Sequence, residues 1–338
     1  MSGEDIELFV SSFGTSLRKK SERVVIKRRD KQVEEVSLRK VRQITVAGRG
    51  VALTSDLVES CARHGIPITF ISAIGEPLAR LSSPAENATA ATRREQVRAY
   101  DDRRGIRVVV EMVASKMFNQ MKLISYFTRR PERIADEEQL EILSGRIADR
   151  IEALYQLEGQ NVDEVREQIL SLEGGAATAY WQAVGLLLGD QLPFTGRNHR
   201  GATDPVNVML NYGYGILYHQ SWSALARAGL DPYAGFLHTD RAGRPSLVLD
   251  FVEEFRQPLV DRAVLSLGLR GFCPELEEGR LADSSRRRLA GAVIDGLDSV
   301  VRYRGQRYRI REVIERQAQL LATAVRCEDS YSGFRWQW

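Results

Sequence analysis

The 338-residue chain has too few cysteines and histidines for a disulfide framework or a structural zinc site. Its three cysteines, Cys61, Cys273 and Cys327, are odd in number, widely separated and without a C-x-x-C pair. Both kinds of structure need paired cysteines at short, regular spacings. We therefore expect three reduced, inert thiols and no structural zinc site.

Long hydrophobic runs and a large net charge are also absent. The longest apolar run, around Leu186–Leu188, is far short of the ~20 residues that a membrane span needs. The N-terminus carries acids where a signal peptide carries bases. The chain is 43% hydrophobic with a formal charge of only +3, so its composition is not that of a disordered protein. We expect a cytoplasmic protein that binds no membrane.

The small net charge conceals an uneven distribution. Residues 1–81 carry 14 basic and 10 acidic side chains, which leaves 34 and 35 for residues 82–338. Seven of the twelve residues from Arg18 to Arg29 are basic. This run is typical of a charged edge strand that resists aggregation, but it also suits contacts with DNA phosphates. The residues that would make such contacts are Lys19, Lys20, Arg28 and Arg29.

The length predicts two domains, and the hydrophobic pattern changes near residue 82. Short alternating or β-branched segments in residues 1–81 predict a β-rich domain with one helix, which begins at Thr54 or Ser55 and ends at Gly65. Residues 82–88 have the composition of a linker. The predicted strands cover residues 6–10, 23–28, 33–38, 43–46 and 68–72.

Residues 89–325 show helical periodicity, and residues 326–338 form an aromatic tail that either docks on the helices or remains mobile. The clearest helix follows Asp204, which can cap it, and Pro205, which suits its first turn. The predicted fold is an α+β chain of two domains, a small β-rich one and a larger all-α one. The predicted helices cover residues 89–127, 137–157, 162–172, 205–228, 285–303 and 308–325.

Two acids and a histidine near residue 250 could converge on a divalent cation. Asp250 and Glu253 are three residues apart, so on a helix that begins at Ser246 and is limited by Pro258 they share one face. Carboxylates favour Mg²⁺ or Mn²⁺, and a neutral imidazole such as that of His238 is compatible with Mn²⁺. The ordinary alternatives are a loop histidine and an acid that interacts with the helix dipole.

Glu173 is a second candidate, because helical spacing places it on an apolar stripe with Ala176 and Tyr180. A carboxylate on a buried face is costly unless it is paired or bound to a metal. Either a cation or a buried arginine partner is therefore expected.

Further along the chain, Arg197 and Arg200 lie on a Gly-flanked loop that suits phosphate contacts. The tyrosines of the next helix suit base stacking or core packing.

Together these segments resemble the CRISPR-associated spacer integrases, the Cas one family. The resemblance rests on Gly-Leu-Asp-Pro-Tyr-Ala-Gly-Phe-Leu-His238, on Ser-Leu-Val-Leu-Asp250-Phe-Val-Glu253, on Thr-Asp204-Pro-Val-Asn207 and on Leu-Glu173-Gly-Gly-Ala-Ala. The order and intervals of these motifs agree with the family, as does a β-rich front with a helical back. One departure is Arg200-Gly-Ala, where many members carry a basic run followed by prolines.

The resemblance implies that Glu173, His238 and Glu253 ligate Mg²⁺ or Mn²⁺, with Asp250 as a supporting acid and Tyr218 near the active site. It implies a CRISPR adaptation integrase, in which a DNA 3′-hydroxyl attacks a phosphodiester of the repeat, with associated endonuclease activity on double-stranded or branched DNA. Residues 1–81 would form a homodimer, residues 89–325 would be catalytic, and a small partner, the Cas two protein, would bridge two dimers. The alternatives are a stand-alone metal-dependent nuclease and a non-catalytic DNA-binding scaffold.

Overall fold

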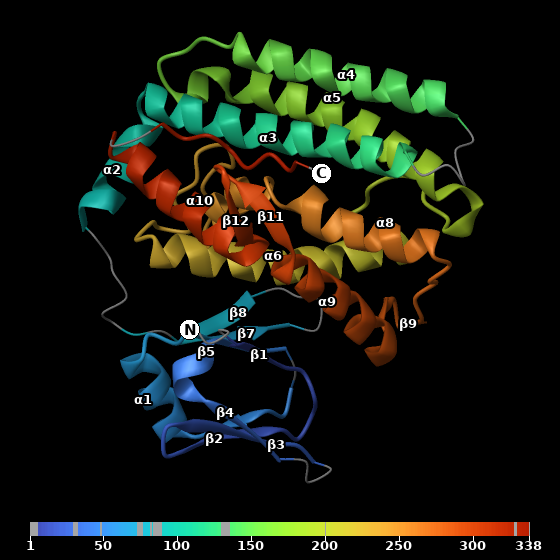
Figure 1. Cartoon of the computed structure of the whole chain (residues 1–338). Helices are drawn as coiled ribbons and strands as arrows, with labels where there is room; N and C mark the ends of the chain where they lie inside the picture. The colour runs from blue at the N-terminus through green and yellow to red at the C-terminus, as the bar shows by residue number, and fades with distance from the viewer. Residues whose placement is uncertain are drawn as a thin grey trace. The chain divides into compact units, whose positions relative to one another are not determined.

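The computed structural model describes residues 6–29, 33–47, 49–72, 77–81, 83, 90–129, 136–199, 201–327 and 330–337. The chain divides into two compact units, Met1–Asn87 and Ala88–Trp338. The first unit is rich in strands and the second is mostly helical (Figure 1), which confirms the predicted fold class. Arg200 and all of the predicted linker except Ser83 lie outside the described residues.

Two four-stranded sheets and α1 (Ser55–Arg63) make up the N-terminal unit. As predicted, α1 ends before Gly65, whose φ of +65° costs glycine little. One sheet has the order β1-β5-β7-β8, formed by Ile6–Val10, Val41–Val46, Ile68–Ile71 and Pro77–Leu81. The other has the order β4-β3-β2-β6, formed by Val33–Ser37, Arg23–Lys27, Ser16–Lys20 and Ala52–Leu53.

The basic run does not lie on an edge strand. It follows β2 and β3, the two inner strands of their sheet, whereas β4 and β6 form the edges. The interpretation as a charged edge is therefore wrong. Strand β2 was not predicted, because Arg18, Lys19 and Lys20 hide its alternation, and its pairing with β3 decides its conformation. Strands β6 and β8 were missed as well.

The C-terminal unit is built mainly of helices. Helices α3, α4 and α5 lie side by side at the top of Figure 1, and α6 and α10 lie below them. As predicted, Asp204 caps α6, since its Oδ1 accepts a hydrogen bond of 2.9 Å from the amide of Asn207. The helices are α2 (Ala90–Tyr100), α3 (Arg103–Thr128), α4 (Glu137–Tyr155), α5 (Val162–Leu188), α6 (Pro205–Arg227), α7 (Ser246–Val252), α8 (Arg262–Leu269), α9 (Asp283–Asp298) and α10 (Ile310–Val325).

Local hydrogen bonding corrects several predicted bounds. The helix predicted over 89–127 is two helices, because Asp102 caps α3 by accepting a 2.8 Å bond from the amide of Arg104. The second unit is also not wholly helical, since it contains two hairpins. They are formed by β9 (Leu276–Glu277) with β10 (Arg280–Leu281), and by β11 (Val300–Tyr303) with β12 (Gln306–Arg309).

Pro258 does not end the helical path that begins with α7. A π-helical segment, Arg256–Asp261, carries the chain into α8. Proline has no amide hydrogen, so the carbonyl of Glu254, four residues earlier, loses its helical donor. The side-chain amide of Asn119 on α3 replaces it at 2.9 Å. The chain therefore continues because another helix supplies the missing hydrogen bond.

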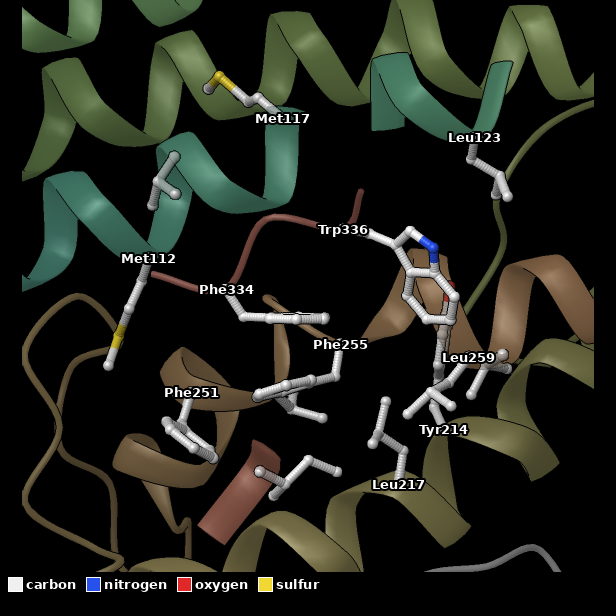
Figure 2. Packing of buried hydrophobic residues seen from close by; sticks show 14 of the residues in the cluster. Met112, Met117, Leu123, Tyr214, Leu217, Phe251, Phe255, Leu259, Phe334 and Trp336 are labelled. Carbon is white, nitrogen blue, oxygen red and sulfur yellow. The ribbon is translucent and has the colours of Figure 1, made fainter. Parts of the chain in front are cut away.

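The aromatic tail docks on the helical unit, which decides between the two alternatives for it. Phe334 stacks on Phe255 at a centroid distance of 5.3 Å and an interplanar angle of 17° (Figure 2). Phe334 and Trp336 are buried in the same core as Met112 of α3.

The three cysteines are free, and burial raises the pKa of Cys61 to about 11, which keeps its thiol unreactive. No helix in the described ranges is long and apolar enough to cross a membrane.

Candidate functional site

Asp250 anchors the loop that carries His238. Its Oδ2 accepts hydrogen bonds of 2.7 Å and 3.0 Å from the amides of Phe236 and Leu237, and its Oδ1 accepts one of 3.0 Å from the amide of His238. The loop approaches so closely that a Cβ at Gly235 would lie 2.6 Å from Cβ of Ser246. Asp250 therefore holds this loop in place, and both of its carboxylate oxygens are already occupied by backbone hydrogen bonds.

The same carboxylate orients the imidazole of His238. Nδ1 of His238 lies 2.6 Å from Oδ1 of Asp250. A carboxylate only accepts hydrogen bonds, so Nδ1 carries a proton in this pair, and in the neutral imidazole the lone pair then lies on Nε2. Metal-ligating histidines usually have such a partner on the second ring nitrogen. The prediction that Asp250 supports His238 thus has a geometric basis.

Lys116 of α3 joins the other two predicted ligands. Its Nζ lies 2.5 Å from Oε1 of Glu173 on α5 and 2.8 Å from Oε2 of Glu253, which directly follows α7. All three side chains are nearly buried. The second oxygen of Glu253 pairs with Arg256 at 2.8 Å. The expected partner of Glu173 is thus a lysine and not an arginine.

These charges reverse the effect of burial on the two partners. Burial alone would raise the pKa of Glu253, but the charges of Arg256 and Lys116 outweigh it and hold this pKa below its usual value. Burial alone would lower the pKa of Lys116, but the carboxylates of Glu173 and Glu253 outweigh it and raise the pKa. At neutral pH the carboxylate of Glu253 is therefore ionised and the ammonium of Lys116 is charged.

The donor chemistry of this cluster fits a hard divalent cation. Oε2 of Glu253 is buried and faces the ammonium of Lys116, 2.8 Å away, in the position where a cation would neutralise it. Two carboxylates and an imidazole nitrogen are suitable ligands for Mn²⁺, and the carboxylates for Mg²⁺. As the side chains stand, no three histidine, cysteine or acidic groups among the residues described lie close enough together to hold a metal ion. Lys116 supplies the positive charge between the carboxylates.

The other predicted site residues lie in different surroundings. Arg197 donates to Asn207 at 2.8 Å and to Asn211 at 2.6 Å, so its guanidinium ties the loop to α6. Tyr218 lies on α6 with its ring centroid 6.3 Å from that of Trp222. The basic residues Lys20 and Arg28 form exposed ion pairs of 3.4 Å and 3.5 Å with acids of β4, and such pairs are weak.

Two cationic members of the site, Lys116 and Arg256, were not predicted. Arg256 lies 4.7 Å over the ring of Tyr214, whose hydroxyl donates to buried Asp261 at 2.5 Å. Tyr180 donates to the same carboxylate at 2.7 Å. A signal for Lys116 existed: it stands in a helical stripe with buried Met112, Val113 and Gln120, and a buried lysine requires an acidic partner as Glu173 requires a basic one.

The family model described as CRISPR associated protein Cas1 matches residues 8–294. The chain is 36% identical to the CRISPR-associated endonuclease Cas1 1 of Archaeoglobus fulgidus, over 98% of this chain and 100% of that protein. It is 29% identical to the CRISPR-associated endonuclease Cas1 1 of Francisella tularensis subsp. novicida, over 98% and 99% of the two chains.

Solved structures share the fold. A casposase bound to integration product superimposes with a TM-score of 0.81 at 23% identity, over 97% of this chain and 92% of the other. A Cas1 protein from Thermotoga maritima gives 0.76 at 21% identity, over 98% and 100%. A Cas6-RT-Cas1–Cas2 complex gives 0.78 at 22% identity, over 99% of this chain and 36% of that one. With the family match over most of its length, this chain belongs to the Cas1 family of CRISPR-associated proteins.

Proposed function

We propose that this chain is a CRISPR adaptation integrase that joins a DNA 3′-hydroxyl to a phosphodiester of the repeat, with associated endonuclease activity. The observation that carries the proposal is the junction of Glu173, Glu253 and Lys116, together with an imidazole of His238 that Asp250 orients through Nδ1. Its family membership and the names of its relatives, endonucleases and a casposase bound to integration product, support the same reaction class.

In this proposal Glu173, Glu253 and His238 would hold Mg²⁺ or Mn²⁺. When bound, the cation would supply Lewis-acid stabilisation of charge on the phosphate oxygens. Asp250 keeps the His238 ring oriented, and Arg256 holds Glu253 in place through its 2.8 Å ion pair. Lys116 is the one cationic group placed between both carboxylates in the described structure, so it can turn toward an incoming phosphate.

The strand-transfer step itself separates the integrase from a stand-alone nuclease. The experiment offers the protein a labelled protospacer end and a supercoiled plasmid carrying repeats, with Mn²⁺ and with or without the partner protein. The expected result is a joined product whose formation needs a free 3′-hydroxyl. Hydrolysis without any joined product would establish the nuclease alternative. No reaction at all, with DNA binding retained, would establish the scaffold.

The proposed assembly is a homodimer formed through the N-terminal unit, with two dimers bridged by a Cas2 protein. The structural likeness to a Cas6-RT-Cas1–Cas2 complex supports the choice of partner. Two copies of the site would then serve the two ends of one spacer. Light scattering of the chain alone and with the partner measures both stoichiometries.

The basic run on β2 and β3 is proposed to contact DNA phosphates. Replacing Lys19, Lys20, Arg28 and Arg29 by glutamine is expected to flatten the dependence of log K on log salt by about 0.9 for each residue that contacts phosphate. The measurement is a salt titration of duplex binding. The matched control replaces four exposed cations of the same unit outside this run, Arg39, Lys40, Arg49 and Arg63. Equal slopes in the two quadruple variants would exclude this run from the interface.

A further inference from the structure

The aromatic tail meets the helical unit directly beside Glu253. The next residue, Glu254, is fully buried, and its carboxylate contacts the tail. Its Oε2 accepts a hydrogen bond of 2.6 Å from the amide of Phe334, and its Oε1 accepts one from the hydroxyl of Tyr331. Gln317 of α10 adds a third at 2.8 Å. Two of the three donors to Glu254 therefore belong to the tail.

Asn119 of α3 ties the same two segments together a second time. Its side-chain nitrogen donates at 2.9 Å both to the carbonyl of Glu254 and to the carbonyl of Phe334. Its oxygen accepts a 2.8 Å bond from the amide of Trp336. The Glu254 carbonyl needs this donor because Pro258 cannot supply one. One buried amide thus joins the tail to the turn that follows α7.

Two residues of α3 that lie one helical turn apart contact two consecutive residues of the turn after α7. Lys116, one helical turn before Asn119, contacts the carboxylate of Glu253, while Asn119 contacts the backbone of Glu254. Behind the turn, Phe255 stacks on Phe334 (Figure 2). The ligand proposed at position 253 is therefore followed by two residues that are both held by the tail.

We propose that the tail segment Tyr331–Gln337 is a positioning element of the active site, which fixes the direction of the Glu253 carboxylate by holding Glu254 and Phe255. This inference rests on the proposed function, since it takes Glu253 as a metal ligand. A purely stabilising tail would contribute to the free energy of unfolding without changing the cation affinity of the folded protein. A positioning tail changes that affinity, because outer contacts of metal ligands are typically worth 10- to 100-fold in binding.

Gly333 offers a way to shift the tail without shortening the chain. A Cβ at this position would lie 2.6 Å from the carbonyl oxygen of Glu111 on α3 and would also meet the hydroxyl of Ser115. Gly333→Ala therefore pushes the tail away from α3. Ser332→Ala is the matched control, because this exposed neighbour loses only a 3.2 Å hydrogen bond from Arg304. Tyr331→Phe removes a single donor to Glu254 and keeps the ring.

The test measures the dissociation constant of Mn²⁺ by electron paramagnetic resonance on the full chain, at a temperature where circular dichroism shows every variant folded. We expect about 10- to 100-fold weaker binding for Gly333→Ala, a smaller weakening for Tyr331→Phe, and no change for Ser332→Ala. Unchanged affinity in folded Gly333→Ala and Tyr331→Phe would overturn the inference.

A second readout separates this inference from the proposed function. Hydrogen exchange of the amides at residues 253–256 is expected to be faster in Gly333→Ala than in Ser332→Ala, while α5 keeps its protection. If the unmodified protein binds no Mn²⁺, the proposed function fails and exchange at 253–256 alone decides the role of the tail. Equal exchange in the two variants would then refute the positioning role.

Discussion

Replacing Glu173 by glutamine is expected to abolish high-affinity Mn²⁺ binding and to reduce strand transfer by at least about a thousand-fold. A catalytic cation contributes several kcal/mol of transition-state stabilisation, and each 1.36 kcal/mol corresponds to a factor of ten in rate. The glutamine side chain keeps the size of Glu173 but removes the charge that faces Lys116 at 2.5 Å. The measurements are the Mn²⁺ dissociation constant and single-turnover strand transfer.

The Lys116→Met variant is expected to bind Mn²⁺ more tightly than the original protein, whereas Glu173→Gln is expected to bind it more weakly. Removing the ammonium between Glu173 and Glu253 leaves two carboxylates facing each other, so a divalent cation gains affinity while the metal-free protein loses stability. Lys122→Met, on the same helix but over the ring of Phe118, is the control. If Lys116→Met weakened Mn²⁺ binding as strongly as Glu173→Gln, the cluster would not be the metal site.

The Asp250→Asn variant is expected to lose about 3–5 kcal/mol of unfolding free energy, the range seen when a buried charged group loses its partners. Asp250 receives three backbone amides and faces Nδ1 of His238, so the amide group of asparagine would turn a donor toward groups that also donate. His238 would then lose its orientation, and strand transfer should fall together with stability.

Denaturant unfolding of Asp250→Asn, compared with that of Asp240→Asn, measures the expected loss of unfolding free energy. Asp240 is exposed on the same loop, so its replacement should leave stability within about 0.5 kcal/mol of the original protein. If the unfolding free energy of Asp250→Asn equalled that of the original protein, the loop would keep its conformation without the carboxylate. In that case Asp250 would be free to act as a direct ligand.

Local signals in the sequence predicted the elements around the site well. Asp204 and Gly65 mark helix ends because capping and left-handed glycine are short-range effects. The start of α7 at Ser246 was also predicted correctly, although the helix ends at Val252 and contains Asp250 but not Glu253. The predictions of Mg²⁺ or Mn²⁺, and of ligation by Glu173, His238 and Glu253, stay predictions that the binding experiments above address.

Long-range partnerships could not be predicted in the same way. The ion pair of Glu173 joins residues 57 positions apart, and periodicity indicates that a buried carboxylate needs a cation without saying which one. The continuation past Pro258 depends on Asn119, 135 positions before Glu254. Strand β2 likewise follows from its neighbour β3 rather than from its own residues. In each case tertiary contacts override the local pattern.

The hydrogen bonds of Asn119 also bear on the order of folding. They connect residues separated by 135 and 215 positions in the chain, and contacts between such distant residues form only after the entropy of closing a long loop has been overcome. Chains are synthesised from the N-terminus, so Asn119 and Glu254 are made well before Phe334. We therefore expect the surroundings of Glu253 to be among the last parts of this unit to be completed, so that newly made chains reach the native arrangement of the proposed metal site only late in folding.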